Sequence, residues 1–598
     1  MFQTFEAQAD PSQGAARLAA LRARLAVEGL RGFLVPRADT HQGEYVAAHD
    51  ERLSWLTGFT GSAGFAVVLP EVAGVFVDGR YRLQARAQVD TGVFTPVDWP
   101  EVQPGPWIAS HLAEGVIGFD PWLHTAEEIG RIEAALAGSA VSLKPQGNMV
   151  DAVWPDQPPP PMGAVFVHPE ALAGESSAAK RARLAEGLRA AGQRAAVITL
   201  PDSICWLLNL RGADVPRNPV LHGFAVLHDD ARVTLYAEPA KLGPDVLAAL
   251  DDQVTLQPPS AFVPSLHALE GPVRVDRASA PLAVSRELER GGVAVIWGDD
   301  PCSLPKACKN AAELAATREA HLRDGAALVG FLHWLEAEAP TGALTEIAVV
   351  RALEGFRRAT NMLHDLSFDT ICGAGPNGAI IHYRVTEATD RPVRPGELLL
   401  VDSGAQYRDG TTDITRTMAV GEVGPEEKLC YTRVLQGMIT ISRTRFPRGL
   451  AGRDLDALAR APLWRDGFDY DHGTGHGVGT FLSVHEGPQR ISRLSDVQLA
   501  AGMILSNEPG YYRTGAFGIR LENLIAVEEA PPLGDNRPQL RFETLTFVPF
   551  ERRLILTDLL SSDERTWLDA YHAVVLAKIG PRVESAAQAW LKRACAPL

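Results

Sequence analysis

Acidic residues in the last third of the chain could hold metal ions. Asp402 ends the apolar run LLLVD, and Asp413 directly precedes the run ITRTM. The residues between them, SGAQYRDG, are typical of a turn, so we expect a hairpin that brings the two carboxylates together. Two such acidic residues are by themselves more often a feature of a turn than a site, and the interpretation therefore depends on further ligands.

Histidines and glycines alternate in DHGTGHGVGTFLSVHEGP, residues 471–488. This segment holds His472, His476 and His485, three of the 16 histidines in the chain. The interleaved glycines let the backbone pass close to a neighbouring group and adopt a positive φ. A lone histidine is usually satisfied by a carbonyl or by water, but three among glycines indicate a functional segment.

Two further motifs supply the remaining carboxylates. In ILSNEPGYY, Glu508 ends a strand-like run because Pro509 cannot continue a ladder of hydrogen bonds. In FGIRLENLIAV, the alternation of a strand places Arg520 and Glu522 on one face. A charged pair on a buried strand costs free energy unless it is paired or bound to a metal, and a simple Arg–Glu ion pair remains an alternative at this point.

Together these motifs offer four carboxylates and one imidazole: Asp402, Asp413, His476, Glu508 and Glu522. If they met without a cation, the negative charges would repel and some carboxyl groups would be protonated. Two divalent cations would neutralise them. Oxygen-rich donors with a single nitrogen favour a harder first-row ion, Mn²⁺ first, although Zn²⁺, Co²⁺ or Fe²⁺ would also fit. Two-metal centres hold their ions about 3.5–4 Å apart and activate a shared water.

An internal repeat lies in the first half of the chain, before the segments that carry these residues. RARLAVEGL at 22–30 returns as RARLAEGL at 181–188, and WLTGFTG at 55–61 is echoed by WLLNLRG at 206–212. Each repeated helix leads into an apolar, strand-like run. The repeats keep their order and their approximate spacing, so we interpret them as two similar α/β domains in tandem.

Two segments mark domain boundaries. PDQPPPPMG at 155–163 is too rich in proline for a helix or a central strand. The second boundary falls near residues 299–310, where Asn310 can cap a helix with Glu313 as its reciprocal partner. This helix should end near Glu338. We therefore predict domains at 1–154, 155–305 and 306–598.

The last domain mixes helices and strands. Helical patterns cover about 345–358, 426–446 and 452–461, and a final helix begins near Ser561 with Glu564 as its capping partner. Strand-like runs cover about 366–372, 379–383, 397–402, 411–419, 502–507, 518–527 and 542–549. Because short turns separate most of these strands, a mixed or antiparallel sheet is expected.

The composition excludes several classes of protein. The chain has 598 residues, 46% hydrophobic and 22% charged, with a net charge of −16, which is typical of a folded protein and not of a nucleic-acid binder or a polybasic membrane anchor. Six cysteines without a CxxC pair indicate reduced thiols. No signal peptide is visible, and the apolar stretch 326–335 is too short to span a bilayer. We expect a soluble, cytoplasmic protein without a nucleic-acid or membrane partner.

The ordered motifs LVDSGAQY, TTDITRT, HGTGHGVG, NEPGYY and GIRLEN resemble those of the pita-bread metallopeptidases. Their five ligand positions are 11, 63, 32 and 14 residues apart, which fits that family. More closely, the chain resembles the three-domain Xaa-Pro aminopeptidases. VDGRY at 77–81, WLTGFTGSAG at 55–64, KNAAEL at 309–314 and GAGPNGAIIHY at 373–383 carry this likeness, which covers essentially the whole chain.

The resemblance implies a fold and a reaction. The fold would be two tandem creatinase-like α/β domains followed by a pita-bread α+β catalytic domain. The reaction would release the N-terminal residue from a peptide with proline in second place, by attack of a metal-bridging hydroxide, in a homodimer. It further implies the following ligand roles: Asp402 mainly on one metal, Asp413 and Glu522 bridging, His476 on the second metal, and Glu508 both as ligand and as proton shuttle.

The resemblance also implies substrate-binding residues. His485 would stabilise the tetrahedral oxyanion, while His382 and His472 would line the proline side of the pocket. His476 and Glu508 would also face the substrate. Arg520 would orient a ligand carboxylate from behind, and Arg80 in the first domain would contact the substrate. Each of the three histidines beside the metals has an alternative as a packing residue, and Arg80 as a surface arginine in a turn.

Three other functions compete with this interpretation. A prolidase cuts only Xaa-Pro dipeptides, but such chains typically lack the middle domain. A metal-free hydrolase of the creatinase type, or a non-enzymatic peptide- or histone-binding relative, would have lost the carboxylates that are intact here.

A nucleotide site is not expected. Residues 373–378 match GxGxxG, but the following AIIHYRV reads as a strand, whereas a dinucleotide fingerprint requires a helix there.

Overall fold

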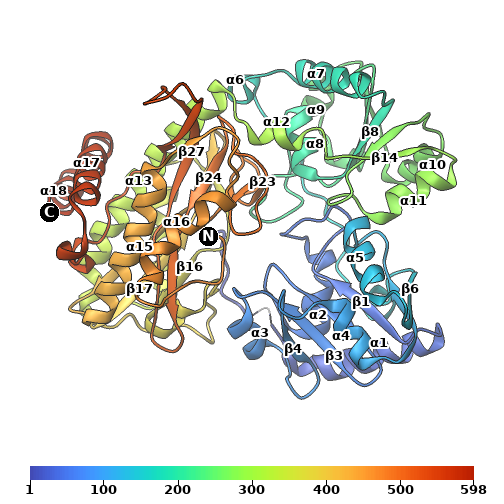
Figure 1. The fold of residues 1–598 in the computed structure, drawn as a ribbon, viewed down its shortest axis with the longest axis horizontal. Helices are drawn as coiled ribbons and strands as arrows, with labels where there is room; N and C mark the ends of the chain where they lie inside the picture. The colour runs from blue at the N-terminus through green and yellow to red at the C-terminus, as the bar shows by residue number, and fades with distance from the viewer. Residues whose placement is uncertain (8) are drawn as a thin grey trace. The chain divides into compact units, whose positions relative to one another are not determined.

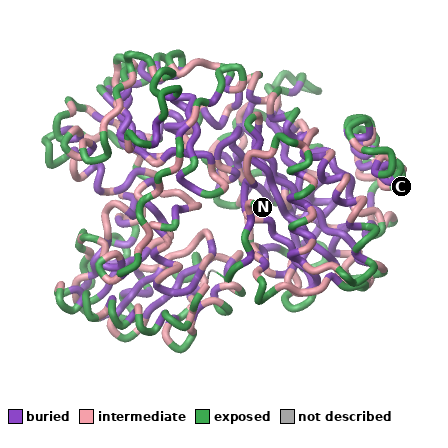
Figure 2. Tube along the Cα trace, turned by 180° about the vertical axis from the view of Figure 1, so that it is seen from behind, coloured by how far each residue is buried: buried purple, intermediate pink, exposed green. Residues whose placement is uncertain are grey.

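The computed structural model describes residues 1–7 and 9–598, which fall into two compact units (Figure 1). One unit extends to Ser303; the other comprises Leu304–Leu598 and the N-terminal residues Met1–Ala7. In Figure 2 the strands of both units trace buried paths, and loops and outer helix faces are exposed. Within the described residues, no helix combines the length and apolarity needed to cross a membrane.

The first unit begins with a six-stranded sheet. Its strands are β1 (Gly32–Pro36), β2 (Phe65–Val68), β3 (Ala73–Val77), β4 (Thr95–Asp98), β5 (Glu114–Phe119) and β6 (Ala140–Pro145). Its helices are α1 (Gly14–Val27), α2 (Arg52–Thr57), α3 (Arg82–Gln88), α4 (Pro104–His111) and α5 (Ala126–Leu136). Leu18, Leu21 and Leu25 recur at helical spacing on α1 and are buried in the core, which explains why this segment packs as an amphipathic helix.

A second six-stranded sheet follows in the same unit. Its strands are β8 (Ala195–Ile198), β10 (Phe224–His228), β11 (Val233–Tyr236), β12 (Val254–Gln257), β13 (Val273–Val275) and β14 (Val295–Trp297). The helices α7 (Ser177–Ala190), α8 (Pro201–Leu208), α9 (Pro244–Ala249), α10 (Phe262–His267) and α11 (Leu282–Arg290) accompany it.

The two sheets have the same topology. The first is ordered β4-β3-β2-β1-β5-β6 and the second β12-β11-β10-β8-β13-β14. In both, the central pairs β1–β2 and β8–β10 are antiparallel, and the flanking pairs β1–β5 and β8–β13 are parallel. The repeat at 22–30 and 181–188 lies on the equivalent helices α1 and α7. The predicted tandem of two similar α/β folds is therefore confirmed, while the boundaries at 154 and 305 remain predictions.

The second unit combines long helices with antiparallel sheets. Its helices are α12 (Ser303–Ala307), which begins one residue before this unit, α13 (Ala311–Glu338), α14 (Glu346–Arg358), α15 (Pro425–Arg443), α16 (Arg453–Trp464), α17 (Ser562–Ile579) and α18 (Ser585–Ala594). One sheet is ordered β16-β17-β20, from Ile371–Ala374, Glu397–Ser403 and Ile414–Val420. A larger one is ordered β21-β28-β27-β24-β22-β23, from Arg445–Pro447, Gln539–Thr544, Asn523–Ala530, Ile504–Asn507, Gly475–Gly477 and Glu486–Ile491. Smaller sheets join β15 (Leu363–Leu366), β18 (Ala405–Tyr407) and β19 (Gly410–Thr411), and β25 (Gly510–Arg513) with β26 (Phe517–Arg520).

The helix starts expected from capping residues are confirmed. Asn310 and Glu313 form a reciprocal capping box at the start of α13, and Ser561 and Glu564 form one at α17. The helices expected at 345–358, 426–446 and 452–461 are α14, α15 and α16.

Several expected strands are wrong in part or in whole. The run 366–372 covers only the end of β15 and the start of β16, with no strand at 367–370, and residues 545–549 of the run 542–549 lie beyond the end of β28. Residues 379–383 form no strand, because the chain leaves a short 3-10 helix at Gly375–Ala379 and turns. The buried carboxylate of Glu346 on α14 holds this turn by accepting hydrogen bonds from Ala374 N, Asn377 Nδ2 and Tyr383 OH. The run 518–527 is two strands, β26 and β27, which break at residues 521–522 and pair in different sheets.

A buried ionic network fixes the hairpin between β17 and β20. Asp324 on α13 pairs with Arg357 on α14 at 2.9 Å and accepts hydrogen bonds from Tyr407 OH and Thr412 Oγ1. Arg357 also donates to the carbonyl oxygens of residues 403 and 404, directly after Asp402. Burial opposes ionisation, but these partners hold the pKa of Asp324 below its ordinary value.

Replacing Arg357 by methionine should destabilise the protein by about 3–5 kcal/mol, because Asp324 would remain buried without its cation. Urea unfolding would measure the loss. The control is Arg358→Met, whose side chain is 53% exposed and pairs with Glu354 at 3.4 Å, so its cost should be at most about 1 kcal/mol. Equal unfolding midpoints for the two variants would contradict the structural role of the network.

Candidate metal centre

The structure brings all five predicted ligand residues to neighbouring strand ends. Asp402 lies in β17 opposite Thr415 of β20, and Asp413 immediately precedes β20. His476 is the middle residue of β22. Glu508 and Glu522 flank the pairing of β24 with β27, in which Asn507 lies opposite Asn523. Residues spread over 120 positions therefore meet because two antiparallel sheets end at the same place.

The side-chain distances define one cluster. Ligand atoms of Asp413, His476 and Glu522 all lie within 4.8 Å of one another. His476 Nε2 is 3.4 Å from Asp413 Oδ2 and 3.5 Å from Glu508 Oε1. Asp402 joins the cluster through Arg520, whose Nη2 donates to Asp402 Oδ2 at 2.6 Å and whose Nε is 4.0 Å from Glu508 Oε2.

Burial and mutual repulsion dominate the electrostatics of this cluster. Desolvation, followed by the charges of neighbouring carboxylates, raises the pKa of Asp413 and of Glu522 well above their ordinary values. Burial also raises the pKa of Glu508, although His476 and Arg520 oppose the shift. Asp402 Oδ1 and Glu522 Oε1 are buried without a hydrogen-bond partner. Buried carboxylate oxygens without a hydrogen-bond donor can act as ligands of a cation, so these residues fit divalent cations.

Short polar side chains hold the ligands in place. Thr415 Oγ1 donates to Glu522 Oε2 at 2.7 Å. Ser506 Oγ accepts from the backbone N–H of His476 at 2.9 Å and donates to Glu508 Oε1 at 3.2 Å. The positions of the Glu508 and Glu522 carboxylates are therefore fixed by hydrogen bonds from the side chains of Ser506 and Thr415 as well as by the backbone.

The glycines around His476 are required for close packing. A Cβ at Gly475 would lie 2.0 Å from Ser506 O, and one at Gly477 would lie 2.3 Å from Glu486 O. Neither glycine has a positive φ, nor do the others of this histidine segment, Gly473 and Gly479. The expected close approach of the backbone is therefore confirmed, but the expected positive φ is wrong.

Tyr512 connects two predicted residues and was missed from the sequence. Its hydroxyl lies 2.9 Å from His472 Nε2 and accepts from Arg520 Nη1 at 2.7 Å, and Arg520 in turn binds Asp402. The tyrosine is the last residue of the NEPGYY motif, and this was the available signal. Arg520 therefore contacts the carboxylate of Asp402, a predicted ligand residue, and its orienting role remains a prediction.

Of the other predicted substrate residues, His485 and His382 lie in the same unit as the cluster, and Arg80 lies in the other unit. The ring centroid of His485 is 4.3 Å from that of His476, edge to face. His382 is half-buried in the turn that Glu346 holds, and the 3-10 helix before it packs against β26 at Gly518. Arg80 belongs to the other unit, where Asp78 binds its guanidinium at 2.7 Å and its side chain is 26% exposed. A substrate contact by Arg80 remains a prediction.

A buried ionic cluster lies directly beside His485. Glu486 is fully buried and lies between the ammonium groups of Lys306, at 3.0 Å, and Lys309. Lys309 is further anchored by its backbone N–H, which donates to Gly502 O at 3.0 Å. The segment that enters this unit therefore fixes the loop that carries His485.

Replacing Lys309 by methionine should lower kcat by about 10- to 100-fold with little change in metal content, because small displacements of a reacting group are costly. Lys309→Arg should restore much of the rate, and Lys428→Met, which removes a lysine 3.9 Å from exposed Glu422, should have no effect. In a His485→Ala background the Lys309 substitution should add no further loss. Additive losses would show that Lys309 does not act through His485.

Comparisons with known proteins agree with this geometry. The model of Metallopeptidase family M24 matches residues 315–529, that of its C-terminal region 538–598, and two models of the Creatinase/Prolidase N-terminal domain match 17–153 and 156–313. The chain is 39% identical to a probable Xaa-Pro aminopeptidase P of Laccaria bicolor, over 97% of this chain and 93% of that protein. It is 40% identical to aminopeptidase P2 of Arabidopsis thaliana, over 95% and 86%.

A solved structure is similar over the same extent. The X-prolyl aminopeptidase of Caenorhabditis elegans, described as a cytosolic enzyme with a di-nuclear active site, aligns with a TM-score of 0.93 and 33% identity. The alignment covers 98% of this chain and 99% of that one. Fold and cluster together define a metallopeptidase with two creatinase-like N-terminal α/β domains and a pita-bread catalytic domain. The chain belongs to metallopeptidase family M24.

Proposed function

We propose that the protein is a metal-dependent aminopeptidase that releases the N-terminal residue from peptides with proline in second place. The observation that carries this proposal is the buried cluster of four carboxylates and one histidine, in a chain similar over its full length to Xaa-Pro aminopeptidases. A prolidase-type dipeptidase is the competing function, and the second α/β domain argues against it.

Asp402, Asp413, His476, Glu508 and Glu522 would hold two divalent ions. The C. elegans relative is described as di-nuclear, and the oxygen-rich donor set favours Mn²⁺. When bound, such ions make water acidic enough to act as a nucleophile near neutral pH.

Glu508 is the residue placed to move the proton. Its carboxylate lies 3.5 Å from His476 Nε2, at the open end of β24. It takes the proton from the attacking water and delivers it to the proline nitrogen, which leaves only when it is protonated. Arg520 keeps Asp402 oriented by its 2.6 Å hydrogen bond.

The surrounding histidines would bind the substrate. His485, beside His476, donates a hydrogen bond to the developing oxyanion, a contribution of roughly 2.7–4 kcal/mol. His382 and His472 line the proline side, and Arg80 contacts the peptide. The scissile bond before proline is a tertiary amide without an N–H, so the site must recognise the rigid ring instead of that donor.

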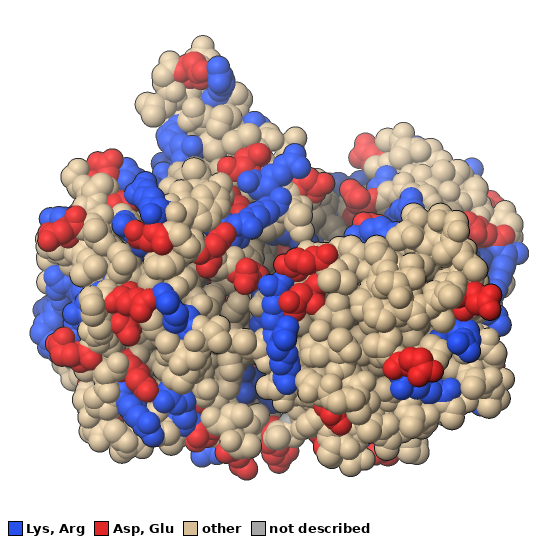
Figure 3. Space-filling view, turned by 60° about the horizontal axis from the view of Figure 1, so that its bottom comes forward, with Lys and Arg blue, Asp and Glu red and all other residues tan. Residues whose placement is uncertain are grey.

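We also propose that the protein is a cytoplasmic homodimer that acts on peptides alone. The C. elegans relative is described as cytosolic. Basic and acidic side chains are interspersed on the face drawn in Figure 3, as expected for a partner other than nucleic acid.

Metal removal is the test of the proposed function. The chelated protein should not hydrolyse an Xaa-Pro tripeptide, and added Mn²⁺ should restore hydrolysis with two ions bound per chain. The matched Xaa-Ala peptide should be cut at least about 100-fold more slowly, because this site recognises the ring. Full activity of a verified metal-free sample would overturn the proposal, and cleavage confined to dipeptides would assign the protein to the prolidase class.

Glu508→Gln should lower kcat by about 10²–10⁴-fold, because the amide can still coordinate through oxygen but cannot carry a proton. The control is Glu528→Gln, an exposed carboxylate on β27 that pairs with Arg541 at 2.6 Å and should retain full activity. Both variants are assayed with bound metal quantified. A fully loaded Glu508→Gln enzyme with the parent rate would exclude the proton-shuttle role.

A further inference from the structure

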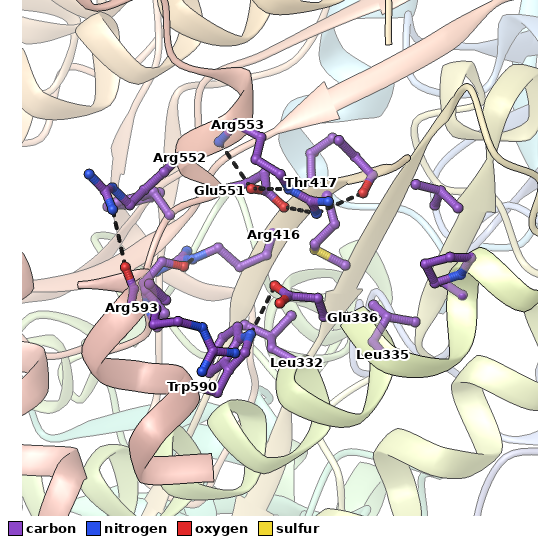
Figure 4. Close-up of a pocket in the computed structure, with 18 residues that line it drawn as sticks. Leu332, Leu335, Glu336, Arg416, Thr417, Glu551, Arg552, Arg553, Trp590 and Arg593 are labelled. Atoms are coloured by element: carbon purple, nitrogen blue, oxygen red, sulfur yellow. Dashed lines mark hydrogen bonds and ion pairs between the residues drawn. The ribbon is translucent and has the colours of Figure 1, made fainter. Parts of the chain in front are cut away.

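A cavity of about 210 Å³ lies on the side of β20 opposite the metal cluster (Figure 4). Side chains alternate along this strand. The hydroxyl of Thr415 donates to Glu522 Oε2 in the cluster, and that of Thr417 donates to Arg520 O. Arg416 and Met418, with neighbouring atoms of Thr417 and Ala419, line the cavity. Helices α13 and α18 and the segment 549–553 form the other walls.

The cavity combines apolar walls with an excess of positive charge. Leu332, Leu335 and Met418 contribute apolar surface. Four arginines and two glutamates also line it: Arg416, Arg552, Arg553, Arg593, Glu336 and Glu551. Arg553 is paired with Glu551 at 2.6 Å. Among the described residues, no carboxylate lies within ion-pair distance of the other three guanidinium groups, so the cavity carries net positive charge.

Arg416 is the unusual member of this group, because it is buried without a counter-ion. Its side chain is 3% exposed, and its N–H groups donate to carbonyl oxygens of residues 415, 522, 548 and 549, to Asn523 Oδ1 and to Tyr571 OH, so that its hydrogen bonds are satisfied while its charge is not neutralised. Its guanidinium carbon lies 4.3 Å from the ring centre of Phe550. Buried charges in proteins are normally paired, so an anion in this cavity would gain a favourable interaction.

We propose that this cavity binds a small carboxylate with a short apolar body, and that its binding changes the metal affinity of the cluster through Arg416. The volume suits a molecule of a few heavy atoms and is smaller than typical drug-binding pockets. Two sources share this chemistry, a free apolar amino acid and a plain alkyl carboxylate. Glu336, which accepts from Trp590 Nε1 at 2.9 Å (Figure 4), is the group that would bind the ammonium of an amino acid.

The coupling follows from the contacts of Arg416. Its Nη1 donates to Glu522 O at 2.6 Å, so the guanidinium binds the backbone of a residue of the cluster directly. A carboxylate bound in the cavity would attract this guanidinium. The attraction would act on the backbone of Glu522, and so on the position of its carboxylate, on the other side of β20. Binding itself is independent of the proposed function, but the effect on metal affinity depends on the assignment of Glu522 as a ligand.

The binding test uses 4-methylpentanoate, its neutral analogue 4-methylpentanamide, and leucine, titrated calorimetrically into the full-length protein. The acid should bind saturably at one site per chain, and the amide at least about tenfold more weakly. Leucine binding more tightly than the acid would identify an amino acid as the ligand; weaker binding would identify a plain carboxylate. Equal binding of acid and amide, or no saturation by about 10 mM, would overturn the proposal.

Variants locate the site. Met418→Trp should fill the cavity, and Arg593→Gln should remove an exposed cation from its rim; both should weaken binding of the acid at least about tenfold. Lys592→Gln, on the same helix but outside the lining, is the control. If Met418→Trp fails to fold, Arg593→Gln alone decides. A change of oligomeric state in Arg593→Gln would show that a second copy covers this face and would overturn the proposal.

The coupling is measured as the Mn²⁺ dissociation constant with and without saturating 4-methylpentanoate. We expect a change of about fivefold or more, and by linkage the same factor in the affinity for the acid when Mn²⁺ is bound. Unchanged constants would overturn the coupling. Absence of any Mn²⁺ binding would instead overturn the proposed function, while the titration of the acid would still decide the cavity.

Discussion

Repulsion among buried carboxylates is the constraint on which the catalytic unit depends. Burial first, and then the charge of neighbouring carboxylates, Asp402 among them, raises the pKa of Asp413, Glu508 and Glu522. One guanidinium, that of Arg520, cannot balance this charge. Divalent cations would balance the remaining charge, and the hydrogen bonds from Thr415 and Ser506 hold the carboxylate oxygens of Glu522 and Glu508 in place for them.

The rest of the unit is organised around that cluster. The Asp324–Arg357 network fixes the hairpin on one side, and the Glu486 ion pairs fix the histidine loop on the other. Both use fully buried charges, which are costly to desolvate and therefore specify one arrangement strongly when their partners are all present. On the reverse face of β20, Arg416 is the exception: its charge is surrounded by carbonyl oxygens without a carboxylate partner.

Much of this architecture could be predicted from residue patterns. The tandem repeat and the capping boxes at Asn310 and Ser561 followed from local sequence, and the meeting of the five predicted ligand residues followed from motifs that resemble those of a known family. The turn at 379–383 did not, because its apolar residues resemble a strand and only the distant Glu346 bends the chain there. Tyr512 and the lysines around Glu486 act through contacts between segments far apart in the chain, and no local pattern encodes such contacts.

The two N-terminal sheets share one topology but use their charges differently. After β3, Arg80 binds Asp78 in a half-exposed turn, whereas after the equivalent strand β11, Lys241 forms a buried 3.0 Å ion pair with Asp214. In the second domain Lys241 therefore stabilises the fold through a buried ion pair, whereas in the first domain Arg80 remains partly accessible to solvent. Substitutions at these matched places should therefore have different consequences during evolution, since one threatens the integrity of a domain and the other the proposed contact with the peptide.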